Sequence, residues 1–260
     1  MRVWLLMLSA IAFVHTAFGQ KIDSFLPETP TETAVIVCSG GSYFWSANKT
    51  ESDSVARTLQ AHGIAAYVLH YRTGGILPFI THSRLIFPGH QYPMPLDDLR
   101  QALDSVRRVG YGRVGVMGFS AGGHLALAAA LFNKGVLRPD FVVPCYPVVT
   151  MREPYVHKRS RRGLLGEYKK HSRTRQDSLS LEHHVTADCP PVFLMNCVDD
   201  PIVDYHNSVL MDSALTAHHV PHRYIQYQTG GHGFGTVWSK TTKEASGWFD
   251  AFLEWLNIIE

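Results

Sequence analysis

Cysteine, net charge and long apolar runs are all scarce in this sequence of 260 residues. It has only four cysteines, and Cys38, Cys145 and Cys197 each end a short apolar stretch, where a cysteine usually acts as a small buried hydrophobic residue. Cys189 precedes two prolines, a position that favours the surface, and a strand between Cys189 and Cys197 would hold them too far apart for a bridge. The cysteines therefore indicate no disulfide framework.

The formal net charge of +2 is close to neutral, which argues against nucleic acid as a partner. The spacing of cysteine, histidine and aspartate matches no metal-binding pattern, so we expect neither a metal nor another cofactor. No linker, repeat or low-complexity stretch divides the main part of the chain. We therefore expect one domain over residues 20–260.

The first residues have the pattern of a secretory signal peptide. Arg2 precedes an apolar run from Val3 to Val14, and Ala17-Phe18-Gly19 is a small-x-small cleavage site before Gln20. The apolar run is too short to span a bilayer, and no cysteine follows the cleavage site to carry a lipid. We expect residues 1–19 to be removed and the protein to be exported, to the periplasm or the extracellular space.

Apolar stretches and amphipathic patterns alternate along the rest of the chain. Strands are expected at Ala34–Cys38, Ala65–Leu69, Arg113–Met117, Phe141–Cys145, Val192–Cys197 and Arg223–Tyr227. Helices are expected at Lys49–His62, Leu96–Val109, Ser120–Phe132, Tyr205–His218 and Thr242–Ile258. Continuous apolar strands separated by amphipathic helices predict an α/β fold, with a mostly parallel sheet and helices on both faces.

The most informative motif is the stretch Gly115–His124, in which an apolar strand turns into a helix with Ser120 at the corner. This is the G-x-S-x-G nucleophile elbow in its proper setting. Gly118 and Gly122 lack the Cβ atoms that would collide where strand and helix cross, so the serine can occupy a strained turn with its hydroxyl exposed. The helix after Ser120 directs its positive end toward the group that the serine attacks.

An elbow of this kind requires an acid and then a histidine further along the chain. The expected strand 192–197 leads directly into Asp199 and Asp200, and the next strand leads into a glycine-rich turn around His232. Ser120 is a poor nucleophile at neutral pH and needs His232 to accept its proton. The acid would fix the tautomer of His232 and stabilise the imidazolium.

Two choices within this set rest on position. Asp199 and Asp200 are both candidates for the acid, and the motif favours Asp200, three residues before Val203. The chain has 15 histidines, and His232 is distinguished by its place after the last expected strand and before the last helix. His124 directly follows the elbow, and we expect it to be structural.

The fourth element of such a site is an oxyanion hole built from backbone N–H groups. The loop 39–45 follows the first expected strand and contains Gly40 and Gly41, which let the main chain approach a bound carbonyl. The N–H group of Gly41 or Ser42, together with that of Ala121 after the nucleophile, would hold the developing oxyanion.

Several motifs extend in a fixed order over nearly the whole of residues 20–260: Ser39-Gly40-Gly41-Ser42-Tyr43, Leu69-His70-Tyr71-Arg72, Pro93-Met94-Pro95-Leu96-Asp97-Asp98, Val114–His124, Asp199–Val203 and Gly230-Gly231-His232-Gly233. With them the chain resembles the exported carbohydrate acetylesterases of the α/β-hydrolase fold, which include acetyl xylan esterases and feruloyl-esterase-like enzymes. The resemblance implies that Ser120, Asp200 and His232 form a catalytic triad and that the substrate is an acylated carbohydrate. The family usually has a proline and a third glycine where Ser39 and Ser42 stand, an exchange that preserves the backbone donor.

Two segments interrupt the alternation of strands and helices. Residues 72–92 have no clear period, and residues 151–175 carry nine lysines and arginines at a place where hydrolases of this fold often insert a lid. A solvated basic surface and a surface that contacts substrate are equally compatible with the second segment. Tyr43, Trp45 and Trp238 lie in or beside the expected catalytic loops, where they would either stack on a sugar or pack the loops.

These observations predict a secreted serine esterase that removes acetyl or other short acyl groups from carbohydrate such as acetylated xylan, through an acyl-enzyme. A lipase or peptidase of the same fold is the alternative within the enzymes. A carbohydrate-binding protein without activity is the alternative outside them, and the complete triad disfavours it. The sequence specifies no oligomeric state.

Overall fold

The computed structural model describes residues 21–46, 49–82 and 89–259. The expected signal peptide, residues 1–19, lies outside these described residues. The described part contains a sheet formed by β1 (Lys21–Phe25), β2 (Thr33–Cys38), β3 (Ala65–His70), β4 (Arg113–Phe119), β5 (Val142–Cys145), β6 (Val192–Cys197) and β7 (His222–Tyr227). Their spatial order is β1-β3-β2-β4-β5-β6-β7. The strands from β2 to β7 are parallel, and only β1 is antiparallel to its neighbour.

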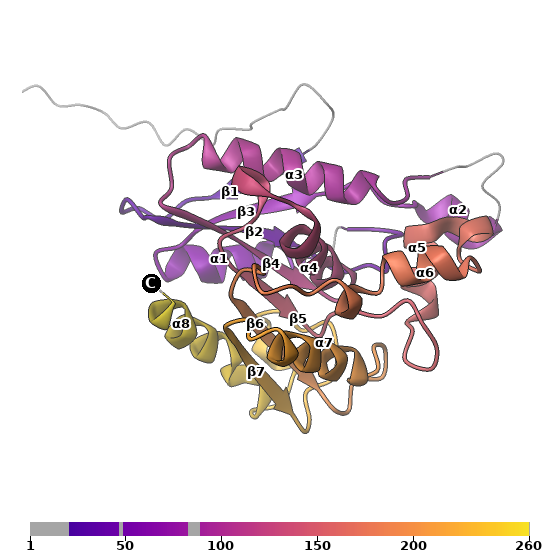
Figure 1. The fold of residues 1–260 in the computed structure, drawn as a ribbon. Coiled ribbons are helices and arrows are strands. Elements are labelled where there is room, and N and C mark those ends of the chain that lie inside the picture. Colours follow the sequence, from indigo (N-terminus) through magenta and orange to yellow (C-terminus); the bar gives the residue numbers. More distant parts are fainter. Residues whose placement is uncertain (1–20, 47–48, 83–88, 260) are drawn as a thin grey trace, which may run out of the picture.

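Helices cover both faces of this sheet (Figure 1). They are α1 (Asp53–Ala61), α2 (Ile76–Thr81), α3 (Met94–Arg107), α4 (Ala121–Phe132), α5 (Lys158–Lys169), α6 (Arg173–Ser178), α7 (His206–Ala217) and α8 (Trp248–Ile258), with short 3₁₀ turns η1 (Gly135–Leu137), η2 (Leu181–His183), η3 (Trp238–Lys240) and η4 (Ala245–Gly247). One apolar core lies between the sheet and α3, α4 and α7, and a second lies between the sheet and α1 and α8. The predicted fold class is thereby confirmed. No helix in the described part of the chain is both long and apolar enough to cross a membrane.

The strand that the sequence pattern misses is β1, at the edge of the sheet. It pairs with β3 alone, and Ile22 is its only buried residue. An edge strand with one partner and little burial lacks the continuous apolar run by which the central strands are recognised.

The last expected helix begins later than predicted, because the residues before it are bound to another loop. The hydroxyl of Thr241 donates to the carbonyl of Gly230, and that of Thr242 donates to the carbonyl of Thr229. Residues 242–247 therefore form a turn against the loop that carries His232, and α8 starts only at Trp248.

All four cysteines are buried and unbridged. This corrects the expectation that Cys189 lies near the surface: it is only 6% exposed and packs into the core beneath α7. The two prolines that follow it lead into the buried strand β6, which draws the cysteine inward.

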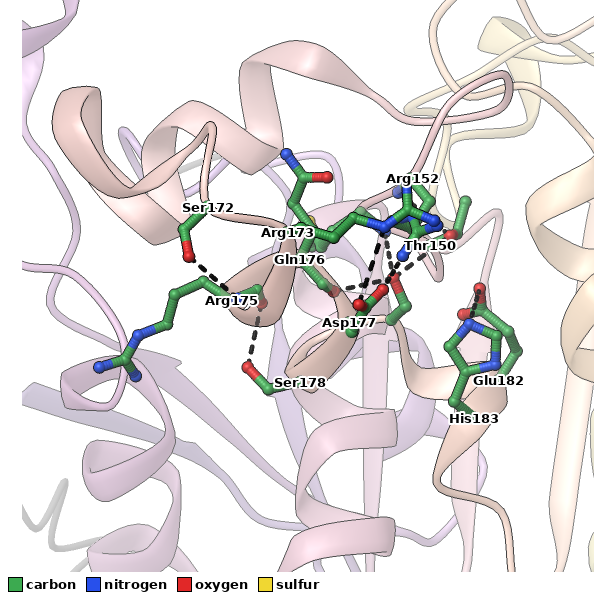
Figure 2. A network of polar contacts seen from close by, with 12 residues as sticks. Thr150, Arg152, Ser172, Arg173, Arg175, Gln176, Asp177, Ser178, Glu182 and His183 are labelled. Carbon is green, nitrogen blue, oxygen red and sulfur yellow. Dashed lines mark hydrogen bonds and ion pairs between the residues drawn. The ribbon is translucent and has the colours of Figure 1, made fainter.

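Both segments that interrupt the alternation contain helices, and Figure 1 shows α2, α5 and α6 together at one end of the molecule. The second segment is fastened to the chain that follows β5. Asp177 in α6 contacts the guanidinium of Arg152 and lies 3.8 Å from that of Arg173 (Figure 2). The hydroxyl of Ser180 accepts the N–H of Met151 at 3.0 Å. These contacts hold α6 against the chain that follows β5.

Candidate active site

Ser120 occupies the corner between β4 and α4 in a strained conformation, with φ 55° and ψ −117°. Its N–H donates to the carbonyl of Cys145 at 3.0 Å, which fixes this turn on the neighbouring strand. A Cβ on Gly118 would lie 2.1 Å from the carbonyl oxygen of Gly122, and one on Gly122 would lie 2.0 Å from that of Cys38. The elbow geometry and the reason for its two glycines are as the sequence predicts.

The surroundings of Ser120 are more closed than the sequence suggests. The residue is only 5% exposed, whereas the motif predicts an exposed hydroxyl. The helix α4 behind it is buried on every side, and its N-terminal end points at the serine. The N–H of Ala121, the first residue of α4, has no partner inside the helix and is available to an oxyanion.

The acid and the histidine form a direct pair. Oδ2 of Asp200 lies 2.6 Å from Nδ1 of His232, and Oδ1 of the same carboxylate accepts the N–H groups of Ile202 and Val203 at 2.8 and 2.9 Å. The Asp200 side chain is 1% exposed and that of His232 is 11% exposed. Because a carboxylate only accepts hydrogen bonds, Nδ1 is the donor in this pair, and in the neutral imidazole the lone pair is then on Nε2.

Asp199 has a different partner. Its Oδ1 accepts the N–H groups of Gly230 and Gly231, each at 2.9 Å, and thereby shapes the loop that carries His232. The structure therefore brings Asp200, and not Asp199, to the imidazole.

The loop 39–45 approaches Ser120 from the other side. A Cβ on Gly40 would lie 3.0 Å from that of Ser120, so only glycine allows this approach. Gly41 and Ser42 both have positive φ, 131° and 55°, and in the described residues neither N–H donates to a protein acceptor. These donors and that of Ala121 are the ones expected to form the oxyanion hole.

Two of the sequence motifs meet behind this loop. The hydroxyl of Tyr71 donates to the carbonyl of Ser39 at 2.7 Å, and the guanidinium of Arg72 forms a paired hydrogen bond with Asp98, which is fully buried. The N–H of Gly74 donates to the carbonyl of Tyr43 at 2.7 Å. The loop is thus held from below by the segment that follows β3.

The aromatic candidates divide into two kinds. Tyr43 is 1% exposed, and its hydroxyl lies 2.8 Å from Nδ1 of His124, so that of its two expected roles the ring has the second: it packs the loop and is not exposed to a substrate. His124 is structural, as expected: its Nε2 lies 2.9 Å from the carbonyl of Leu179, and burial lowers its pKa to about 4. Trp45 and Trp238 are 38% and 43% exposed and remain available to a ligand.

A buried pair that no sequence motif indicated joins the loops of the site. Glu51 is 2% exposed; its Oε2 accepts the N–H of Gly40 at 2.8 Å, and its Oε1 accepts the hydroxyl of Tyr146 at 3.1 Å. That hydroxyl in turn accepts the N–H of Gly235 at 3.0 Å, and the Tyr146 ring lies 4.7 Å from the ring of His232. The oxyanion loop and the histidine loop are therefore connected through one carboxylate and one phenol.

The signals for these two residues differ. Tyr146 directly follows β5 at the carboxyl edge of the sheet, the edge from which the catalytic loops leave, so its position could have indicated it. Glu51 lies in a stretch expected to be an ordinary helix, and nothing in its neighbours distinguishes it.

His157, which precedes the first residue of α5, is a third residue that no sequence motif indicated. Its Nδ1 lies 2.8 Å from the hydroxyl of Ser160. Its pKa is lowered to about 4, mainly by burial and also by the positive charge of Arg159 and the interaction with His232, while Asp200 acts in the opposite direction. The beginning of α5 therefore lies within electrostatic reach of the Asp200–His232 pair.

The structure does not join every member of the expected triad. Within the described residues, no hydrogen bond links the hydroxyl of Ser120 to His232. The oxyanion loop and the His232 loop nevertheless converge on one carboxylate, because a Cβ on Gly40 would lie 2.7 Å from Oε2 of Glu51 and one on Gly233 would lie 3.8 Å from its Oε1. Hydrogen bonds between catalytic groups often tighten only when substrate binds.

Comparison with known proteins gives consistent results. The model of a family described as having the α/β-hydrolase fold matches residues 85–236. An acetylxylan esterase of Xylanibacter ruminicola is 31% identical over 222 residues, which cover 81% of this chain and 43% of that protein. An endo-1,4-β-xylanase B of Butyrivibrio fibrisolvens is 28% identical and covers 76% of this chain and 32% of that protein. The chain thus spans less than half the length of these two curated relatives.

Solved structures agree over a larger share of both chains. The crystal structure of an acetyl ester-xyloside bifunctional hydrolase from Caldicellulosiruptor lactoaceticus superposes with a TM-score of 0.79 at 30% identity, covering 94% of this chain and 89% of that one. The family match extends from before the elbow to just past the His232 loop. The mostly parallel sheet and the positive φ of Ser120 agree with an α/β-hydrolase fold. This chain belongs to the α/β-hydrolase fold family.

Proposed function

We propose that this protein is a serine esterase that removes acetyl or other short acyl groups from carbohydrate, acetylated xylan among them. The observations that carry the proposal are the pair of Asp200 and His232, in which the carboxylate faces Nδ1 and so suits Nε2 to act as the base, and the strained elbow of Ser120. The names of the relatives, an acetylxylan esterase and an acetyl ester-xyloside hydrolase, support the substrate class. The proposal includes export through the expected signal peptide, leaving a single domain over 20–260.

The geometry implies a sequence of steps. The hydroxyl of Ser120 attacks the ester carbonyl and gives its proton to Nε2 of His232, whose imidazolium Asp200 stabilises. The N–H groups of Ala121 and of Gly41 or Ser42 stabilise the oxyanion. His232 then protonates the departing sugar oxygen, which leaves as a hydroxyl, and a water molecule activated by the same nitrogen releases acetate from the acyl-enzyme. No metal or cofactor is required in these steps.

The direct test is acetate release from acetylated xylan, measured with the purified protein beside p-nitrophenyl acetate, a feruloyl ester and a fatty acyl ester. Acetate release from xylan together with turnover of the acetyl ester would support the proposal. Absence of hydrolysis of every ester would leave a binding protein without activity, and preference for the fatty acyl ester would favour a lipase.

We expect the length of the acyl group to limit turnover. Ser120 is 5% exposed, and the approach of Gly40 leaves little room beside its Cβ. Forcing extra methylenes into closely packed surroundings costs about 1–3 kcal/mol. The kcat/KM for p-nitrophenyl acetate should therefore exceed that for the octanoate by about tenfold or more. Equal use of the two esters in a steady-state assay would contradict this.

Removal of the phenol that joins the two loops should slow the reaction without abolishing it. Tyr146→Phe leaves Oε1 of Glu51 and the N–H of Gly235 without this partner, and an unpaired buried polar group costs about 1–3 kcal/mol. If this loosens the loops, kcat should fall by about ten- to a hundredfold with little change in KM.

The matched control is Tyr67→Phe, which removes a hydroxyl bonded to that of Tyr111 at 2.9 Å on the opposite side of the sheet's centre. Both variants should show similarly lowered midpoints of thermal unfolding, but only Tyr146→Phe should lose kcat. An equal loss of kcat in both variants would reduce Tyr146 to a general stabilising role.

A further inference from the structure

The two inserted segments enclose a strongly basic pocket. A cavity of about 340 Å³ lies between α2 and α5. Its lining contains one aromatic residue from α2, five cationic side chains and a histidine, and no carboxylate: Phe79, Lys158, Arg159, Arg161, Arg162, Lys170 and His171.

The positive charge of this basic pocket is only partly neutralised. Glu167 lies 3.0 Å from the guanidinium of Arg162 and 2.7 Å from the ammonium of Lys170. Glu153 lies 3.4 Å from the guanidinium of Arg161 and 4.0 Å from Nζ of Lys158. Among the described residues, the ion pairs of these five cations thus involve two carboxylates. In a chain whose net charge is +2, this is a local excess that favours an anion.

Arg159 is the cation of the pocket best placed to meet a ligand. It is exposed, and in the described residues no carboxylate lies within 4.0 Å of its side-chain nitrogens. Its guanidinium carbon lies 6.0 Å from the centre of the Phe79 ring. A guanidinium presents a planar set of donors that matches the oxygens of a carboxylate or sulfate.

The floor of the pocket is built from the interior. Arg162 is 14% exposed, and its guanidinium lies 4.8 Å from the ring of Phe44 and 5.1 Å from that of Phe79. It also donates to the carbonyl of Phe79 at 2.6 Å. These contacts fix the aromatic ring and the helix α5 relative to each other, so that the cavity is preformed.

The pocket shares a wall with the candidate active site. A Cβ on Gly163 would lie 2.2 Å from the carbonyl oxygen of Ser42, so the backbone of α5 lies directly against the oxyanion loop. The Phe79 ring lies 5.3 Å from the ring of Trp45, which is exposed at the end of that loop. The pKa of His157 is influenced both by Arg159 of the pocket and by the Asp200–His232 pair, which also places the pocket near the candidate active site.

We propose that the basic pocket binds an anionic group, a carboxylate or a sulfate, on a sugar neighbouring the acylated one, so that the enzyme prefers acidic acylated glycans. This rests on the proposed esterase function. A neutral xylan chain offers no partner for the excess charge, whereas a uronic acid residue offers a carboxylate to Arg159 and Lys158.

The test compares acetylated xylo-oligosaccharides with and without a uronic acid substituent, and a third set with a sulfate in its place. For the wild type we expect kcat/KM to be about three- to tenfold higher for an anionic substrate, mainly through KM, as for partly exposed ion pairs. Arg159→Gln together with Lys158→Gln should remove this preference, and so should high salt. The uronate and sulfate arms identify which anion the pocket selects.

Lys134→Gln serves as the matched control, because it removes an exposed cation at the far end of α4 from Ser120. This variant should keep the preference, and all variants should hydrolyse p-nitrophenyl acetate at the wild-type rate. If the wild type hydrolyses p-nitrophenyl acetate but has equal kcat/KM for neutral and anionic substrates, the proposed anion-binding role of the pocket is wrong. If the wild type hydrolyses none of the esters, the proposed esterase function is wrong instead. Calorimetric titration of the wild type with the unacetylated acidic oligosaccharide would still test the pocket, and failure to bind more tightly than the neutral one would exclude it.

Discussion

Replacing the elbow serine by alanine should lower kcat/KM for p-nitrophenyl acetate by about four decades or more. The Ser120 hydroxyl is the proposed nucleophile, and removing a member of such a triad leaves only the contributions of the oxyanion hole and of binding. Initial rates of p-nitrophenolate release at high enzyme concentration measure the effect, since the residual activity approaches the uncatalysed background.

The same substitution should leave the fold intact. The backbone of Ser120 makes the turn's hydrogen bonds, through its N–H to Cys145 and its carbonyl from Val148, and alanine retains both. The strained φ of 55° is no worse for alanine than for serine. The thermal midpoint should therefore stay within a few degrees of the wild type. Activity within about tenfold of the wild type would remove Ser120 from its role.

The adjacent aspartates offer a second large effect with a built-in control. Asp200→Asn should lower kcat by about four decades, because the amide of asparagine can donate to Nδ1 of His232 and so favours the tautomer with its proton on Nε2. That tautomer cannot accept the proton of Ser120.

Asp199→Asn should cost less than about tenfold. The Oδ1 atom of Asp199 accepts the N–H groups of Gly230 and Gly231, and asparagine keeps a carbonyl oxygen for both bonds. The two variants differ by one position in the same loop, so steady-state kinetics on both separate the orienting role from the shaping of the loop. A larger loss for Asp199→Asn would reverse the assignment.

Local rules are sufficient for much of this molecule. The central strands are continuous apolar runs because both of their faces are covered by helices, and such runs are recognisable without a partner. The elbow around Ser120 is local at Gly118, where a Cβ would clash with Gly122, whereas a Cβ at Gly122 would clash with Cys38 on the neighbouring strand β2. Where burial is one-sided, as in β1, the same rules give no signal.

The sequence by itself was sufficient to predict the central strands, the elbow, and the candidates for the acid and the histidine. Each of these depends on a periodicity or on the order of strand ends. The motif favours Asp200 over Asp199, but only the tertiary structure shows which of them contacts His232, since both follow β6 and the contact depends on where the His232 loop crosses them. The tertiary structure alone also placed Glu51 beneath two loops that are distant from each other in the chain. The inward orientation of Tyr43 is likewise visible only in the tertiary structure. Hydrogen bonds and burial between separate segments leave no pattern in the local sequence.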